Sequence, residues 1–303
     1  MLHRISMIQS LTVSYWISFS LTFALQKLEA IGIELMRIKK TIKWVSSILA
    51  RKRRGPVAIT MHHIRESEFD WVHSFFLELK QRYEFIDPSH ASRRRSMSSD
   101  NLLVTFDDGL KSQKRLVDEV LDPLEIKALF FVPTGFIGLS GIDAIEFAKE
   151  RFFPESSPPD TAAGAYDAMT WEDLKNLRSR GHLIGGHTHS HPKLSDLGAS
   201  EQEREIIDSA DILAHELGCH ITHFAYPFGS LDSVNEDSLR LAGARFDICF
   251  SNVRGMLAEQ PSANFVYRQN IELGSSLNNA IAAVEGRLDW KYRGVRKAIA
   301  GFG

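Results

Sequence analysis

Three histidines at alternating positions form a dense group of chemically active side chains. Residues 185–192 read GGHTHSHP. Imidazoles this close would repel one another if protonated and would lose solvation if buried, and a divalent metal ion relieves both costs. His187 would share the metal with His189 along one face of a strand, or with His191 around a turn. The alternative is a surface loop that is merely rich in histidine.

Two adjacent aspartates form a second such group. Residues 105–109 read TFDDG, so Asp107 and Asp108 stand where an apolar run ends and Gly109 permits a turn. Neighbouring residues of a strand face opposite ways, so only a kink brings both carboxylates into one site. Two histidines and one aspartate would make a three-ligand metal site with open positions, and the second aspartate would act as general base on water. The alternative is a helix start with one aspartate as its N-cap.

Composition limits the kinds of site that the chain can build. Cys219 and Cys249 are its two cysteines, so it can form at most one disulfide and no thiolate zinc cluster. Metal chemistry must therefore use histidine and carboxylate. A length of 303 residues with 44% hydrophobic side chains excludes wholesale disorder.

Charge divides the chain into a basic leader and an acidic body. Residues 1–54 hold ten Lys and Arg against two acidic residues, although the whole chain has a net charge of -2. An acidic body argues against a nucleic-acid enzyme, whose active face would be basic. We therefore expect no nucleic-acid partner.

Seven short, β-rich runs alternate with helical stretches beyond Pro56. The strands are expected near 57–63, 102–107, 128–133, 182–187, 223–227, 246–250 and 266–272, and the helices at 68–83, 111–121, 143–152, 171–180, 199–217, 235–243 and 276–299. Strict alternation with nearly continuous apolar strands predicts a parallel sheet covered by helices. Both motifs follow the C-terminal ends of strands, which favours an irregular seven-stranded, TIM-barrel-like (β/α) barrel over an open doubly wound sheet. The Pro- and Gly-rich stretch 153–168 is typical of a long rim loop.

We expect three parts along the chain: an apolar and basic extension over residues 1–55, a catalytic barrel over 56–275, and a C-terminal helix over 276–303 that packs on the barrel or trails it. Residues 5–26 have the length of a membrane span. Eight of residues 5–25 are Ser, Thr or Gln, however, which suit a bilayer core poorly. No clean cleavage site for a secretory signal peptide follows.

Residues 36–54 contain eight basic and no acidic residues, interleaved with apolar ones. The pattern fits an amphipathic helix on a membrane surface, and it fits a solvated basic linker equally well. Peripheral membrane contact through this stretch is therefore an expectation. A cytoplasmic or membrane-associated location is favoured over free secretion.

From Pro56 to about Glu272 the sequence resembles the polysaccharide deacetylase family, a group of carbohydrate esterases that includes chitooligosaccharide, peptidoglycan and exopolysaccharide deacetylases. The resemblance is carried by TFDDG at 105–109, HTHSH at 187–191, MTWEDL at 169–174, GHLIGGH at 181–187 and FAYPFG at 224–229. It implies a metal-dependent hydrolase that removes N-acetyl groups from amino sugars of an oligo- or polysaccharide. It also implies one divalent metal ion as cofactor, with zinc as the expected ion.

The resemblance also implies roles for individual residues. Asp107 would be the general base, and the metal ligands would be Asp108, His187 and His191, with Thr188 in support and His189 outside the ligand set. In the third motif this chain has Ala225 where the family commonly has Arg, and Phe228 where it commonly has Tyr. The backbone N–H of Phe228 can still serve the oxyanion site. The residues on either side of it, Pro227 and Gly229, are candidate substrate-binding residues.

Two catalytic groups of the family are missing from their usual places. Arg268, in the last predicted strand, is the candidate replacement for the arginine that orients the base, because a cation there would keep Asp107 ionised. Its alternative is an ordinary surface arginine. The family's late histidine is absent, but VAITMHHI at 57–64 resembles the branch whose first strand ends in Tyr-His. His63 is therefore the candidate proton donor, and its alternative is a hydrogen-bonded structural histidine.

Two other kinds of function stay open. The same site would suit an O-acetyl esterase or an amidase that acts on a non-sugar amide. A catalytically silent carbohydrate-binding relative is suggested by the missing arginine and the missing late histidine. The expected partner in most of these cases is an acetylated oligo- or polysaccharide.

Overall fold

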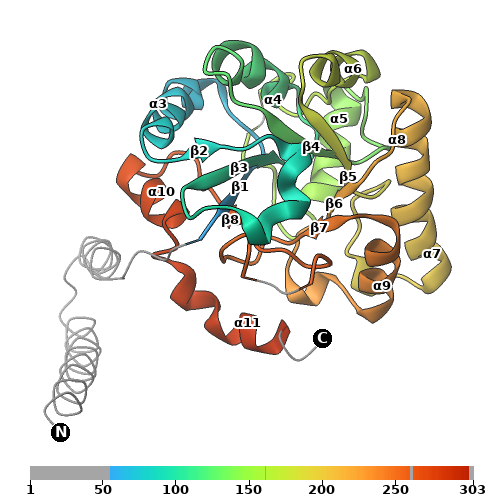
Figure 1. Cartoon of the computed structure of the whole chain (residues 1–303). Coiled ribbons are helices and arrows are strands. Elements are labelled where there is room, and N and C mark those ends of the chain that lie inside the picture. The colour runs from blue at the N-terminus through green and yellow to red at the C-terminus, as the bar shows by residue number, and fades with distance from the viewer. Residues whose placement is uncertain (1–54, 161, 260–261, 300–303) are drawn as a thin grey trace, which may run out of the picture. The chain divides into compact units, whose positions relative to one another are not determined.

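Seven parallel strands curl into a ring that helices surround (Figure 1). The computed structural model describes residues 55–160, 162–259 and 262–299. The strands of the ring are β1 (Val57–Met61), β3 (Asn101–Phe106), β4 (Ala128–Val132), β5 (Leu183–Gly186), β6 (His223–Ala225), β7 (Ile248–Phe250) and β8 (Gln269–Asn270). They follow the order β7-β6-β5-β4-β3-β1-β8, and every neighbouring pair is parallel. The predicted parallel (β/α) barrel is confirmed.

A short segment joins the two edges of the sheet. Val266 bridges to the end of β7, and three residues later β8 pairs with β1. The strand predicted over 266–272 thus serves both edges, and Arg268 lies between the two pairings, fully buried. The short strand β2 (Glu84–Phe85), which was not predicted, pairs with β3. Its two residues are too few to show an alternating pattern.

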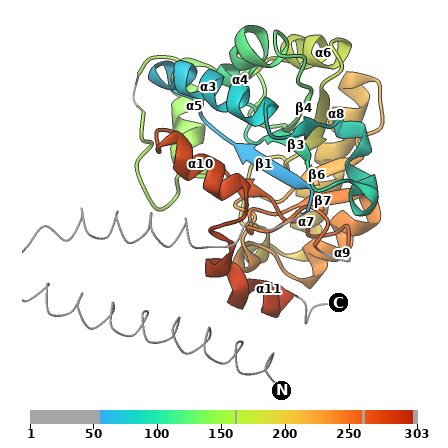
Figure 2. The ribbon, with the colours of Figure 1, turned by 60° about the vertical axis from the view of Figure 1, so that its left-hand side comes forward.

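Helices cover the outside of the ring. They are α3 (Phe69–Lys80), α4 (Lys111–Leu116), α5 (Gly141–Phe147), α6 (Trp171–Ser179), α7 (Ala199–Glu203), α8 (Ser209–Leu217), α9 (Glu236–Arg245), α10 (Leu277–Val284) and α11 (Arg293–Ile299). Helices α3 and α10 pack against each other (Figure 2). The single helix predicted over 276–299 is wrong, because the chain leaves α10 through Gly286, whose φ of 69° is left-handed. Glycine adopts this conformation readily, and it ends a helix.

Alternate strand residues fill the ring in layers. An apolar cluster inside it contains Ala58, Leu103, Leu129 and Phe131. Thr60 and Thr105 follow two residues later along β1 and β3, on the same face and fully buried. The interior therefore becomes polar towards the C-terminal ends of the strands, where the candidate residues lie.

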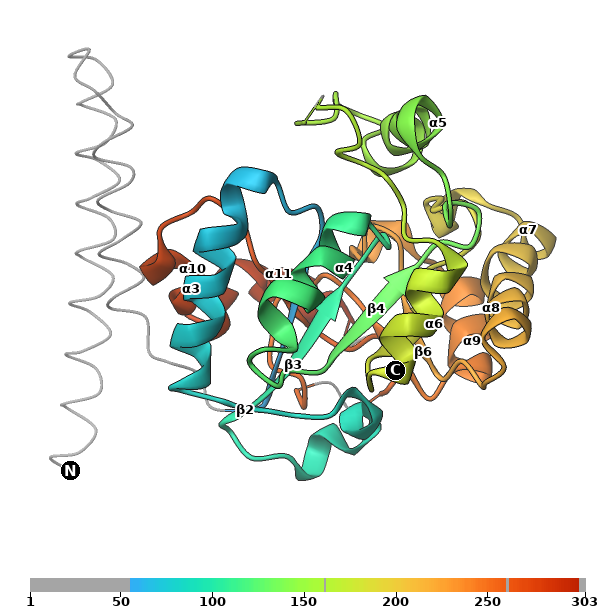
Figure 3. The same ribbon diagram turned by 90° about the horizontal axis from the view of Figure 1, so that it is seen from above.

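A long excursion between β4 and β5 extends beyond the arrowheads of β3 and β4 (Figure 3). It covers residues 133–170, includes α5 and contains the stretch 153–168 that was predicted as a rim loop. The excursion has a small apolar core of its own, which also includes Leu110 from outside it. Its members from the excursion are Phe136, Ala144, Ala148, Tyr166 and Ala168. Its side chains can therefore contribute to a site at this end of the ring.

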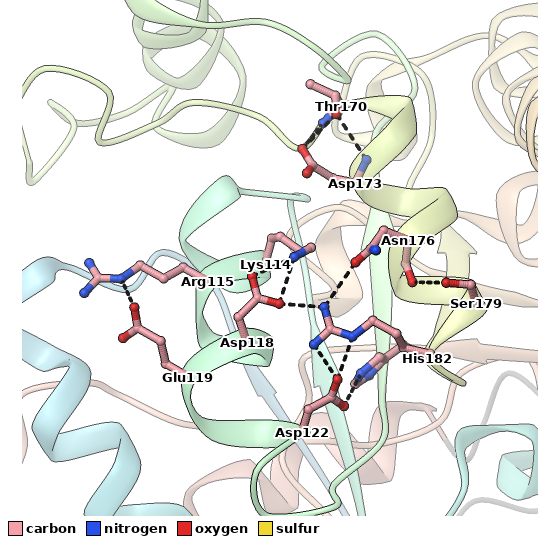
Figure 4. A network of polar contacts seen from close by, with 11 residues as sticks. Lys114, Arg115, Asp118, Glu119, Asp122, Thr170, Asp173, Asn176, Ser179 and His182 are labelled. Carbon is pink, nitrogen blue, oxygen red and sulfur yellow. Dashed lines mark hydrogen bonds and ion pairs between the residues drawn. The ribbon is translucent and has the colours of Figure 1, made fainter.

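A polar network ties β4 to β5 at the opposite end (Figure 4). His182 precedes β5, and its Nδ1 accepts the N–H of Ala128 at 3.1 Å while its Nε2–H donates to Asp122 at 3.1 Å. Lys127 and Arg180 bind the same carboxylate. Burial lowers the pKa of His182 to about 4, against the pull of Asp122, so the ring is neutral at neutral pH.

Replacing His182 by alanine is expected to lower the free energy of unfolding by about 1–3 kcal/mol, because the buried Ala128 N–H loses its acceptor. The stability of the wild type should also fall as pH drops from about 6.5 towards 4, since the unfolded chain binds a proton that folded His182 does not. The variant should lack this part of the pH dependence. Urea denaturation at several pH values measures both effects. His73→Ala, on the exposed face of α3, is the control, and equal stability of the two variants would contradict the role of this network.

The extension predicted over residues 1–55 lies outside the described residues, apart from Gly55. The basic stretch 36–54 is part of it. Within the three described ranges, no helix is long and apolar enough to cross a membrane.

Candidate functional site

The end of β3 turns sharply and brings both aspartates into one site. The N–H of Asp107 still bonds to the Met61 carbonyl of β1 at 3.1 Å, so Asp107 continues the strand. Asp108 then has a φ of 76° and Gly109 one of 71°, both left-handed. Such backbone in a non-glycine residue costs about 1–3 kcal/mol and is concentrated at functional sites. A side chain on Gly109 would not fit, because its Cβ would lie 2.8 Å from Val132.

The loop after β5 folds back so that His187 and His191 face each other, with ring centroids 4.8 Å apart. Thr188 and His191 are left-handed, with φ values of 66° and 55°, and Thr188 Oγ1 accepts the N–H of His191 at 3.0 Å. His189 points elsewhere, since its Nδ1 lies 2.8 Å from Thr134 Oγ1. Of the two pairings that the spacing allowed, the structure forms His187 with His191.

Asp108, His187 and His191 form a buried group whose ligand atoms lie within 4.8 Å of one another. Oδ1 of Asp108 is 3.6 Å from Nε2 of His187 and 3.5 Å from Nε2 of His191. Both Nδ1 atoms donate to backbone carbonyls, of Ala225 at 2.7 Å and of Arg151 at 3.0 Å. A carbonyl can only accept, so a ring that carries one proton keeps it on Nδ1 and turns the bare lone pair of Nε2 towards Asp108.

Lone pairs alone meet at this point, so the group is suited to a cation. Burial lowers the pKa of His191 to about 4, and its ring is neutral at neutral pH. Burial alone would raise the pKa of Asp108, but the imidazoles of His187, His62 and His191 together outweigh burial and lower that pKa. Neutral imidazoles and an ionised carboxylate are the states that a divalent metal ion binds. The three residues can therefore hold one such ion and leave positions open to water and substrate.

Arg268 forms a bidentate ion pair with Asp107 inside the ring. Its Nη1 and Nη2 lie 2.7 Å from Oδ1 and Oδ2 of the carboxylate. Its N–H groups also donate, at 2.9 to 3.2 Å, to Ser251 O, Thr60 Oγ1, Thr105 Oγ1 and Asn252 Oδ1. Burial alone would raise the pKa of Asp107, but the Arg268 guanidinium, together with His187 and His62, outweighs it and holds that pKa well below the usual range. Arg268 is thus a buried partner of Asp107, and the surface alternative is wrong.

A cavity of about 140 Å³ opens onto these groups. The residues that line it are His62, His63, Asp107, Asp108, Leu110, Phe152, Phe153, Tyr166, His187, His191, Phe228 and Asn252. The excursion between β4 and β5 supplies the rings of Phe152, Phe153 and Tyr166. One cavity therefore brings together two carboxylates, four imidazoles and an aromatic wall.

The turn after β6 contributes backbone to the site. Phe228 has a left-handed φ of 60°, and its ring lies 4.9 Å from that of His191. Among the described residues no backbone carbonyl accepts the Phe228 N–H, so this donor is available to a ligand. Pro227 and Gly229 do not line the cavity. Gly229 shapes the turn instead, because a Cβ there would lie 2.4 Å from the backbone nitrogen of Asn252.

Both histidines that follow β1 line the cavity, and they have different partners. Nε2 of His62 lies 3.6 Å from Oδ2 of Asp107. Nε2 of His63 lies 3.2 Å from Oδ2 of Asp160, and its ring packs on Tyr166 with centroids 4.9 Å apart. His63 is therefore at the rim, as predicted, and it is held by the excursion between β4 and β5.

The contributors to the site that were given no role from the sequence include His62, Asn252 and the Arg151 carbonyl. His62 is beside the predicted donor in sequence, and the paired histidines were a signal for it. Asn252 binds Arg268 and donates to the Phe228 carbonyl at 3.2 Å, but no motif marks it. The Arg151 carbonyl that orients His191 is a backbone group, which the sequence cannot mark.

The sequence profile described as "Polysaccharide deacetylase" matches residues 94–246, half of the chain. The chain belongs to the polysaccharide deacetylase family. The matched region contains both motifs and the Phe228 turn, and it ends before Arg268.

Relatives of this family agree with the match. The chain is 30% identical over 154 residues to the chitooligosaccharide deacetylase of Azorhizobium caulinodans, covering 48% of this chain and 59% of the relative. It is 25% identical over 166 residues to the peptidoglycan-N-acetylglucosamine deacetylase of Bacillus cereus, covering 54% of this chain and 44% of the relative. The chain thus spans about half the length of the curated relatives it matches.

A solved structure shows the same fold. IcaB from Ammonifex degensii superposes with a TM-score of 0.59 at 21% sequence identity. The superposition covers 77% of this chain and 98% of that one. The two chains therefore share one fold over the described barrel.

Proposed function

We propose that this chain is a metal-dependent hydrolase that removes N-acetyl groups from amino sugars of an oligo- or polysaccharide. The observation that carries the proposal is the buried Asp108–His187–His191 group beside an ionised Asp107 on one cavity. A general base next to a metal site suits the hydrolysis of an unactivated amide. Membership of the polysaccharide deacetylase family, and relatives named as deacetylases of N-acetylglucosamine-containing sugars, support the choice of substrate.

Four parts of the cavity have a task in this reaction: the three metal ligands, Asp107, the Phe228 N–H and His63. A divalent ion held by the three ligands would polarise the acetyl carbonyl and acidify water. Asp107, ionised and fixed by Arg268, removes a proton from the attacking water. The Phe228 N–H donates to the acetyl oxygen as negative charge builds on it. His63 then protonates the leaving nitrogen as the C–N bond breaks, and acetate and the free amino sugar are released.

We propose zinc as the ion. Two imidazole nitrogens and one carboxylate oxygen form a ligand set that zinc accepts in catalytic sites with an open position. Other divalent transition metals bind the same donors, and they differ in preferred geometry. Elemental analysis of the purified protein identifies the ion, and a different metal at full occupancy would overturn the choice of zinc.

A matched pair of substrates tests the reaction. We expect the metal-loaded protein to release acetate from oligomers of N-acetylglucosamine faster than from the same sugars acetylated on oxygen. Faster release from the O-acetylated sugars would favour the esterase. No release from either, together with binding of the oligomers, would favour the silent carbohydrate-binding relative.

His63→Ala is expected to slow acetate release from N-acetylated sugars by about 100-fold, because an amine is a poor leaving group without a proton. Hydrolysis of 4-nitrophenyl acetate should be nearly unaffected, since nitrophenolate leaves unprotonated. Steady-state rates on the two substrates measure this difference. The rates of His62→Ala, which removes the neighbouring imidazole of the same cavity, are compared with those of His63→Ala. Equal losses on both substrates would show that His63 is not the donor.

We also propose that residues 36–54 contact anionic membrane surfaces. The excess of basic over acidic residues in this stretch supports the proposal, because each Lys or Arg near such a surface contributes about 1 kcal/mol. Sedimentation of the full chain with phosphatidylserine vesicles at low and high salt is the test. A bound fraction that does not depend on lipid charge would contradict it.

A further inference from the structure

The backbone between the two metal-site histidines is held by one carboxylate. Oε2 of Glu205 accepts the N–H of His189 and the N–H of Ser190, each at 2.8 Å. Its Oε1 accepts the Ser190 hydroxyl at 2.7 Å. Hydrogen bonds to an ionised acceptor are stronger than those between neutral groups. Glu205 thus anchors the middle of segment 187–191, whose two ends carry the imidazoles.

Local preference does not maintain the shape of this segment. Thr188 and His191 both have left-handed backbone, which residues with a side chain rarely adopt. On the other edge of the segment, the N–H groups of Thr134 and Gly135 donate to its carbonyls at 3.2 and 2.8 Å. The strained segment is therefore held from two sides, and Glu205 accepts both backbone N–H groups at its middle.

A π-helical turn directs Glu205 at the segment. The turn covers residues 204–208 and lies between α7 and α8. Its Ile206 is fully buried in the core, and Ser209 Oγ donates to the Glu205 carbonyl at 2.6 Å. Turns of this kind occur often at functional sites, where they redirect a side chain. Within the described residues, all the side-chain hydrogen bonds of Glu205 go to His189 and Ser190.

We propose that Glu205 is a positioning residue for the metal centre. By fixing the middle of segment 187–191, it keeps both imidazoles converging on Asp108 before an ion binds. Ligands that are already in place lose less conformational freedom on binding, so removal of this anchor should appear as weaker metal affinity. The inference rests on the metal site of the proposed function. It does not rest on the substrate, because Glu205 does not line the cavity.

The zinc affinity of full-length variants tests this inference. We expect Glu205→Ala to bind zinc about 10 to 100-fold more weakly than the wild type, measured by competition with a chromophoric chelator. Glu205→Gln should lie between the two, because its amide oxygen accepts the N–H groups without a charge. Circular dichroism of the metal-free proteins checks that each variant folds. If Glu205→Ala does not fold, Glu205→Gln decides by the same comparison.

Glu203→Gln is the matched control. It removes the same charge two residues away, at an exposed position of the preceding helix α7, and should bind zinc as the wild type does. Wild-type affinity in a folded Glu205 variant would overturn the inference, and so would a wild type that binds no zinc. A wild type that binds zinc tightly but releases no acetate would overturn the proposed reaction and leave the role of Glu205 intact.

Discussion

Asp107→Asn is expected to reduce the rate of acetate release by about 1,000-fold, because an amide cannot take the proton from the attacking water. The ligand set of Asp108, His187 and His191 is untouched, so the variant should still bind metal. The amide also leaves Arg268 buried without its full counter-charge, and the protein should lose stability. Rates at saturating substrate, metal content and urea denaturation measure the three effects.

Asp143→Asn, at an exposed position of α5, is the control for this experiment. It makes the same chemical change on the surface and should alter none of the three quantities. A variant at Asp107 that kept the wild-type rate would show that another group activates the water. Loss of metal together with the rate would instead place Asp107 among the ligands.

Arg268→Met is expected to lower the free energy of unfolding by about 3–5 kcal/mol, because it strands the buried Asp107 carboxylate without a cation. It also removes the hydrogen bonds to Thr60 and Thr105 inside the ring. Acetate release should fall by about 100-fold, since a base that is no longer held can move by an ångström or more. Urea denaturation and steady-state rates measure the two losses.

The double variant with Asp107→Asn separates stability from catalysis. Removing the stranded charge should recover part of the stability lost in Arg268→Met, while activity should stay low, so the two substitutions should not be additive. Arg293→Met, at an exposed position of α11, should change neither quantity. Additive losses in the double variant would contradict the pairing of Arg268 with Asp107.

The strands and the metal-site motifs were predictable because their signals are local. An apolar run of five or six residues that is buried on both faces reads as a strand, and β1 and β3 lie within one residue or two of their predicted bounds. TFDDG and HTHSH each place their active side chains within five consecutive residues. The structure adds the reason for their spacing, since Asp108, Thr188 and His191 all have left-handed backbone.

Other features depend on contacts that no local pattern contains. The partner of Asp107 lies 161 residues away in the sequence. The two meet because Arg268 belongs to the short segment that joins β7 to β1 and closes the ring. His62 and His63 follow the last residue of β1, where alternation no longer determines which way each ring faces. A single glycine inside a helical pattern is ambiguous, which is why the break at Gly286 was missed.

Metal removal and return tests the central claim most directly, namely that hydrolysis depends on a divalent ion held by Asp108, His187 and His191. We expect the purified protein to hold one divalent ion per chain and to release acetate from N-acetylglucosamine oligomers. Dialysis against a chelator should stop the release, zinc should restore it, and His191→Ala should lose both the ion and the reaction. Undiminished acetate release by a chain freed of metal would contradict the claim.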